Sequence, residues 1–203
     1  MRFLIISLFI FGVGCQFANS QIDVYNGGTR ISIQQGAVVA IYGSYIDKSG
    51  SGSFGDAPNP PLPPGAPVPL DALIFLSGNL IIHGNIENNN NATNTNLIYA
   101  FENALHTGKV ILAGAADQTI GGLVPSYFPN LELNKSSGSL ILQRNITVDN
   151  NFTLTSGRVN LNGQTLKLSK YGNTVGETAP NSISGYPGQL ETAPFQLSDA
   201  NTN

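Results

Sequence analysis

The stretch "GSLILQRNITVDNNFTLTSGRVNLNGQTLKLS", residues 138–169, decides the fold. Short apolar-polar-apolar triplets recur in it at intervals of six or seven residues. The residues at the centres of the triplets are Ile141, Thr147, Thr153, Asn160 and Lys167. Asn, Gly, Ser and Asp fill the gaps, and Asn and Gly suit corners because both tolerate positive φ. The interval has no helical register, and strands this short would make hairpins too small to bury much surface.

Stacking of the triplets solves the burial problem. If three strands and their corners form one coil of roughly 18–21 residues, each coil lies about 4.8 Å from the next and pairs with it. The pattern therefore predicts a right-handed parallel β-helix of six to eight coils, with a β-sandwich as the alternative. Residues 140–142 should then lie beside residues 159–161, and Arg144, Arg158 and Lys167 should face water. The alternation places these apolar side chains inside: Leu140, Leu142, Ile146, Val148, Phe152, Leu154, Val159, Leu161, Leu166 and Leu168.

The composition supports an all-β chain. Only 10% of the 203 residues are charged, Trp is absent, and 23 Asn accompany 23 Gly. This profile is typical of turns and short strands rather than amphipathic helices. A short helical turn is expected only within residues 96–108.

The N-terminal segment "MRFLIISLFIFGVGCQFANSQ" has the layout of a secretory signal peptide: Arg2, an apolar run, then small residues. We expect residues 1–20 to be removed by cleavage after Ser20, which predicts a secreted, extracellular or cell-surface protein. The apolar run is shorter than the roughly 20 residues that span a bilayer, so no membrane span is expected after cleavage. Lipid attachment at Cys15 and a buried strand are the alternatives.

Cleavage would leave 8 basic and 12 acidic residues and no Cys. Thiol chemistry is then excluded, and the domain must be held by packing and hydrogen bonds. A mildly acidic chain without a basic cluster also argues against nucleic acid as a partner.

The chain divides into segments by composition. We expect the first β-helix coils in residues 21–56 and a Pro-rich loop in residues 57–70, where seven of fourteen residues are Pro. Residues 71–175 should form β-helix repeats, and residues 176–203 an irregular C-terminal tail or a truncated coil.

The run from residue 108 to residue 168 resembles repetitive β-helical, adhesin-like secreted surface proteins of the Bacteroidetes. The residues that match a "G-x-V-x-L-x-G-x-x-x-Q-x-I-x-G" segment and an "F-x-N-L-x-L-N" segment are Gly108, Val110, Leu112, Gly114, Gln118, Ile120, Gly121, Phe128, Asn130, Leu131, Leu133 and Asn134. Later matches are residues 146–148, 152–154, 156–157 and 161–163. The resemblance implies an exported surface segment associated with type IX secretion. It also implies a C-terminal sorting domain, which residues 176–203 do not resemble, so the chain is expected to be an N-terminal fragment or to use another route.

The sequence contains no convincing catalytic or metal site. His83 and His106 are its only histidines, and His106 with Glu102 would give just two ligands. Asp117, Glu132 and Asp149 are spaced so that they could stack on one face of successive coils, as a polysaccharide-degrading enzyme would require, yet scattered carboxylates are more often surface groups. We therefore expect no catalytic residues, no cofactor and no metal.

These features predict a non-enzymatic structural or adhesin-like segment. The alternative is a carbohydrate-binding or polysaccharide-degrading β-helix module, with Tyr42, Tyr45, Tyr99 and Phe101 as stacking platforms, although the lack of Trp weakens it. Surface polysaccharide and other cell-surface proteins are the expected partners.

Overall fold

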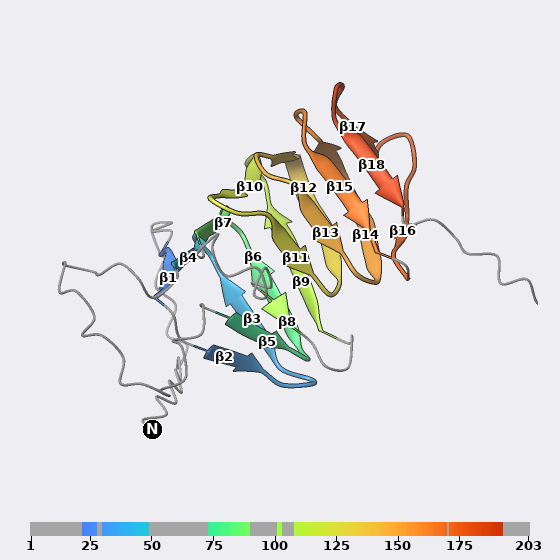
Figure 1. Ribbon diagram of the computed structural model, residues 1–203. Helices are drawn as coiled ribbons and strands as arrows, with labels where there is room; N and C mark the ends of the chain where they lie inside the picture. The colour runs from blue at the N-terminus through green and yellow to red at the C-terminus, as the bar shows by residue number, and fades with distance from the viewer. Residues whose placement is uncertain are drawn as a thin grey trace, which may run out of the picture.

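The strands of this protein wind into a parallel β-solenoid with three faces (Figure 1). The computed structural model describes residues 22–27, 30–48, 73–89, 101–102, 108–169 and 171–192. These residues contain no helix, and every strand pair among them is parallel. The all-β parallel β-helix predicted from the sequence is therefore confirmed.

Each face is a stack of strands from successive turns. Face 1 contains β3 (Val38–Ile41), β6 (Asn79–Ile82), β9 (Lys109–Gly114), the first half of β12 (Leu131–Leu142), the first half of β14 (Asn151–Asn160), and β16 (Asn173–Val175). Face 2 contains β1 (Val24–Asn26), β4 (Tyr45–Lys48), β7 (Ile86–Asn89), β10 (Gln118–Gly122), the second halves of β12 and β14, and β17 (Ile183–Ser184). Face 3 contains β2 (Arg30–Ile33), β5 (Leu73–Leu76), β8 (Phe101–Glu102), β11 (Ser126–Phe128), β13 (Ile146–Val148), β15 (Thr165–Leu168) and β18 (Gln189–Thr192).

The solenoid makes about five turns, fewer than the six to eight predicted. Regular turns bring together residues 20–22 positions apart, as Thr165 and Asn145 show. The first turns are much longer, because Asn85 bonds to Ser44 across 41 positions. A count based on the regular interval therefore overestimates the number of turns. The Pro-rich segment, residues 57–70, lies outside the described residues, between β4 and β5.

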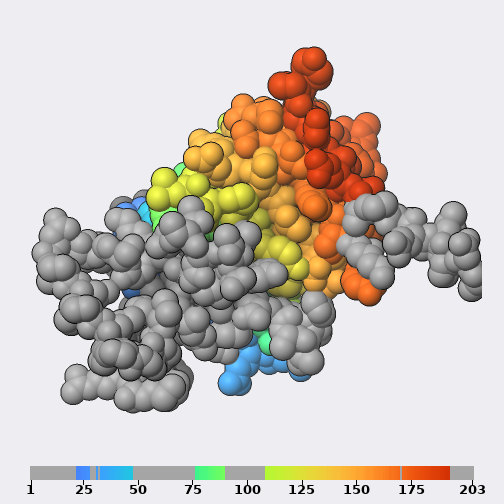
Figure 2. All heavy atoms as spheres, viewed as in Figure 1, coloured from blue at the N-terminus to red at the C-terminus, as the bar shows by residue number. Residues whose placement is uncertain are grey.

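The core is the continuous column of side chains that point inward from all three faces. All ten apolar residues predicted to be internal in residues 138–169 are buried, and Arg144, Arg158 and Lys167 are exposed as predicted. Leu140 pairs with Val159, which confirms the predicted register. Figure 2 shows the later turns as adjoining colour bands from yellow through orange to red. Close packing of this kind stabilises the fold by removing apolar surface from water.

Hydrogen bonds between turns hold the corner that joins faces 1 and 2. A side-chain oxygen of one turn accepts a hydrogen bond from a backbone N–H of the next at four successive levels. The acceptors are Asp23, Ser44, Asn85 and Asp117, at 2.7, 3.1, 2.8 and 2.7 Å from their donors. The small polar residues at these corners thus satisfy backbone groups that no strand ladder reaches.

Residues 101–102 and 176–192 form strands in segments where the sequence predicted irregular structure or a helical turn. Residues 101–102 form strand β8, so the short helical turn expected within residues 96–108 is not formed there, and most of that segment lies outside the described residues. Residues 176–192, assigned from the sequence to a tail or truncated coil, contain β17 and β18, which pair with β14 and β15.

Candidate interaction surface

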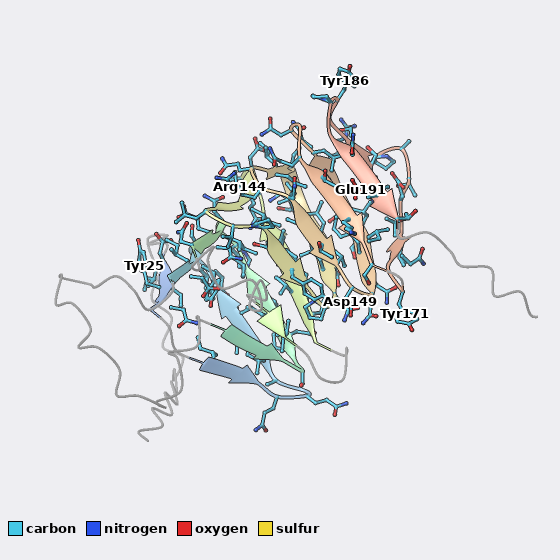
Figure 3. The ribbon with its side chains drawn as sticks, viewed as in Figure 1. Tyr25, Arg144, Asp149, Tyr171, Tyr186 and Glu191 are labelled. Carbon is cyan, nitrogen blue, oxygen red and sulfur yellow. The ribbon has the colours of Figure 1, made fainter. Side chains whose placement is uncertain are left out.

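Outward side chains of successive turns lie in rows along the lateral surface of the solenoid. On face 3, Tyr127, Thr147, Lys167 and Glu191 lie in register on successive strands. Neighbouring members of such a row are about 4.8 Å apart, the distance between paired strands. Figure 3 shows Arg144 and Glu191 on the outside of this later part of the solenoid. The rigid body therefore presents an extended and regular surface, which could contact a long partner at many points.

The three carboxylates considered as an enzymatic groove lie at different positions around the solenoid. Asp117 is at the corner between faces 1 and 2, where its Oδ1 accepts from the Ser139 N–H at 2.7 Å. Glu132 is on face 1, and Asp149 is at the corner between faces 3 and 1. The Asp149 Oδ1 accepts from the Ser169 hydroxyl at 2.6 Å. Each carboxylate bonds to the next turn, so their arrangement serves the cohesion of the stack.

Glu132 contacts both of its neighbouring turns. Its two oxygens accept from Lys109 Nζ at 2.7 Å and from the Thr155 hydroxyl at 2.8 Å, which ties three turns together. Partial burial alone would raise the pKa of Glu132, but the hydrogen bonds from Lys109 and Thr155 outweigh it and lower that pKa. Glu132 is therefore held as a carboxylate, a state suited to this ion pair and not to proton donation.

The half-buried His83 and the exposed Tyr42 form an aromatic pair at the corner between faces 1 and 2. Their ring centroids are 4.8 Å apart and the ring planes differ by 16°, so the rings stack across two turns. Tyr42 is 67% exposed. Gly114 follows on the next turn, and its missing side chain leaves space beside the His83 ring. The pair is thus the clearest aromatic feature on the lateral surface among the described residues.

The other aromatic candidates do not extend this platform. Tyr45 is fully buried, so the expectation that it serves as a stacking platform is wrong. The pairing of β1 with β4 explains the error, because Tyr45 aligns with Val24 on the inward side of face 2. Tyr99 and His106, and the side chain of Phe101, lie outside the described residues.

A buried polar network surrounds Tyr45 inside the first turns. Its hydroxyl donates to the Asp47 Oδ1 at 2.5 Å and accepts from the Asn26 Nδ2 at 3.0 Å. Burial, with a further contribution from Asp47, raises the pKa of Tyr45 well above its ordinary value. Sequence reasoning missed this network, although alternation in "YIDK", residues 45–48, places Tyr45 and Asp47 on the same side of the strand.

A second buried polar network lies inside the corner between faces 1 and 2. The Lys135 ammonium group donates to the Ala116 carbonyl and to the Gln118 Oε1, both at 2.7 Å. The Gln118 Nε2 donates in turn to the carbonyls of Ile82 and Gly84. Burial lowers the pKa of Lys135, and the nearby Asp117 opposes that effect. Sequence reasoning missed Lys135 as well, although it continues the inward alternation of Leu131 and Leu133.

Neither of the two buried polar networks holds enough of the usual metal ligands to form a metal site. Within the described ranges, no three His, Cys, Asp or Glu side chains gather closely enough to hold a metal ion. The same part of the chain has no helix that is long and apolar enough to cross a membrane.

Comparison with known proteins identifies no relative of this chain. No protein family, no curated protein and no solved structure matches the chain.

Proposed function

We propose that this chain is an exported, non-enzymatic structural segment that extends a cell-surface or extracellular assembly in the manner of an adhesin. The observation that carries the proposal is that the three candidate catalytic carboxylates bond to neighbouring turns. Asp117, Glu132 and Asp149 each bond to a neighbouring turn instead of converging on a common groove. Catalysis requires groups that meet at one reacting centre, whereas a rod requires groups that hold its turns together.

Export is the second element of the proposal. It is supported by the signal-peptide layout of residues 1–20 and by the resemblance of residues 108–168 to secreted surface proteins of the Bacteroidetes. The partners we propose are surface polysaccharide or other cell-surface proteins, which would contact the repeated rows of the lateral surface. N-terminal analysis of exported protein should find Gln21 as the first residue. Recovery of an acylated Cys15 would instead indicate anchoring through a lipid.

A carbohydrate-binding module is the second candidate function, and the Tyr42–His83 stack favours it. An exposed aromatic face can pack against the apolar face of a sugar ring, and Tyr42 is the exposed member of the pair. The fold itself does not separate the two candidates, because one architecture can serve unrelated functions.

A triple variant tests the leading proposal. Asp117→Asn, Glu132→Gln and Asp149→Asn, made together, should leave folding and surface attachment nearly unchanged, because each amide retains an acceptor oxygen. The matched control replaces the exposed Glu87, Glu177 and Glu191 with Gln. Purified protein should release neither reducing ends nor unsaturated products from a panel of polysaccharides. Release that only the first triple variant abolishes would overturn the proposal and assign those carboxylates to catalysis.

A single substitution tests the second candidate. Tyr42→Ala should abolish binding to any polysaccharide that the wild-type chain retains, if the stack is the binding platform. Tyr186→Ala is the control, because Tyr186 is 99% exposed but lies at a different corner in the last turn. Equal binding by both variants would exclude the Tyr42–His83 stack as the platform.

A further inference from the structure

Outward side chains at the far end of face 1 form a row along the corner between faces 1 and 2. The row consists of Tyr42, His83, Ala113 and Asn134, one residue from each of four successive turns. Ala113 aligns directly with Asn134, and the registers of β3 with β6 and of β6 with β9 place Tyr42 beside His83 and His83 beside Ala113. Figure 1 shows β3, β6, β9 and β12 as neighbouring strands. Each member of the row therefore lies next to the member of the following turn.

The row has a gap at its third position. Ala113 carries a single methyl group, and the neighbouring Gly114 carries no side chain. Gly114 has a φ of 117°, and a Cβ there would lie 3.3 Å from the His83 carbonyl oxygen and 3.7 Å from the His83 Nδ1. Because Tyr42 stacks on one face of the His83 ring, the small residues of the next turn leave the opposite face uncovered.

The gap has room for one ring. His83 and Asn134 lie two turns apart, so roughly 9.6 Å separates their backbone levels, twice the distance between paired strands. A ring placed over Ala113 would lie about 4.8 Å from each of these levels. The ring centroids of Tyr42 and His83 are stacked at the same distance of 4.8 Å. One further ring would therefore continue the existing stack.

The two walls of the gap differ in polarity. One wall is the aromatic ring of His83. The other wall is the exposed side chain of Asn134, whose Oδ1 accepts a hydrogen bond from the Ser156 hydroxyl at 3.2 Å. This bond holds the Oδ1 toward the following turn and leaves the Nδ2 as a donor for a ligand. A sugar ring matches both walls, because it combines an apolar face with hydroxyl groups.

The charges around the gap favour an uncharged sugar. Residues 109–135 contain four charged side chains. Lys109 and Glu132 pair with each other at 2.7 Å, and Lys135 is buried with its Nζ bonded to two acceptors inside the corner. Asp117 is exposed at the same corner as the gap. A sugar carboxylate would therefore meet Asp117 and find no unpaired, exposed cation within residues 109–135.

We propose that the gap between His83 and Asn134 binds one uncharged sugar ring of a polysaccharide. The apolar face of the sugar packs against the imidazole ring, and a sugar hydroxyl oxygen accepts a hydrogen bond from the Asn134 Nδ2. Tyr42 is a positioning residue, because it stacks on the far face of His83 and holds that ring in place. The gap is the ligand site of the carbohydrate-binding function proposed above as the second candidate, on which this assignment rests.

Affinity electrophoresis of the purified full chain tests the assignment. The native gels contain a neutral polysaccharide (hydroxyethylcellulose, galactomannan or xyloglucan) or polygalacturonate. At least one neutral polymer should retard the wild type, and polygalacturonate should not. Ala113→Leu should weaken this binding at least about tenfold, because the larger side chain fills the gap. Ala40→Leu is the matched control and should bind like wild type, since Ala40 is an exposed, outward residue of face 1 that lies outside the gap.

Variants of the two aromatic residues test the stacking. His83→Ala should abolish binding, whereas His83→Phe should retain it, because phenylalanine keeps an aromatic wall. Tyr42→Ala should also lose binding, and Tyr42→Phe should restore it through the retained stack. Circular dichroism verifies that every variant is folded. Loss of binding in a folded His83→Phe variant would overturn stacking as the basis of recognition.

The remaining outcomes separate the gap from the carbohydrate-binding function itself. Loss of binding in Tyr42→Ala, with wild-type binding in Ala113→Leu and His83→Ala, would place the sugar on Tyr42 and overturn the gap while that function stands. Retardation by polygalacturonate that Ala113→Leu abolishes would overturn the assignment of an uncharged sugar. A wild-type chain that no polysaccharide retards would overturn both the gap and the carbohydrate-binding function.

Discussion

Leu140 and Ile141 are neighbours of similar volume on opposite sides of one strand, which makes them a sensitive test of the stacked core. Leu140 is fully buried and aligns with Gln118 on one side and Val159 on the other. Ile141 points outward between Thr119 and Asn160 and is half-buried. We predict that Leu140→Ala destabilises the protein several times more than Ile141→Ala.

The expected magnitude follows from the carbons removed. Leu140→Ala deletes three buried carbons, worth roughly 2.4 kcal/mol at about 0.8 kcal/mol each. Parallel pairing fixes the spacing of the turns, so the neighbouring side chains cannot close the cavity, and the total should reach about 3–4 kcal/mol. Ile141→Ala deletes as many carbons from a half-buried position and leaves no closed cavity, which predicts about 1 kcal/mol.

Thermal unfolding followed by circular dichroism measures the difference. For a chain of this size, each kcal/mol lowers Tm by about 2–4 °C. Leu140→Ala should therefore lower Tm by about 6–16 °C, and Ile141→Ala by about 2–4 °C. Equal shifts in the two variants, or a larger shift in Ile141→Ala, would refute the assignment of the inward and outward sides.

Three further predictions follow from the buried charges and the corners. Burial lowers the pKa of Lys135 on folding, so the unfolded state binds more protons between the lowered and the ordinary pKa. In urea titrations, the stability of the wild type relative to Lys135→Met should therefore rise as the pH approaches 10.5 from below. The pKa of Glu132 is also lowered, so its contribution, about 1 kcal/mol or less at pH 7, should disappear as the pH falls below about 4.5, and Glu132→Gln should lack that acid-dependent loss. Gly122→Ala should cost more than about 2 kcal/mol in urea unfolding, because Gly122 has a φ of 110° and a side chain there would collide with the Asn88 backbone. Gly163→Ala should cost only about 1 kcal/mol, because Gly163 has a φ of 76° but open space around it.

The sequence by itself determined the fold class and the side of the strand on which each residue of the opening stretch lies. Alternation within the triplets places Leu140 inward and Lys167 outward, since successive side chains of a strand point to opposite faces. A nearly constant interval between triplets determined the pairing of Leu140 with Val159. Both are local properties of the chain, so they can be read without knowledge of distant contacts.

Only the tertiary structure decided which residues of different turns meet. The partner of Tyr45 on the next turn is Ile86, because a long connection separates β4 from β5, and no fixed interval predicts that pairing. The same applies to the Lys135–Gln118 contact and to the placement of Asp117, Glu132 and Asp149 around the solenoid. Strand alternation sets the direction of a side chain, but the length of each connection sets what it touches. The position of every polar contact between turns therefore depends on the assembled stack.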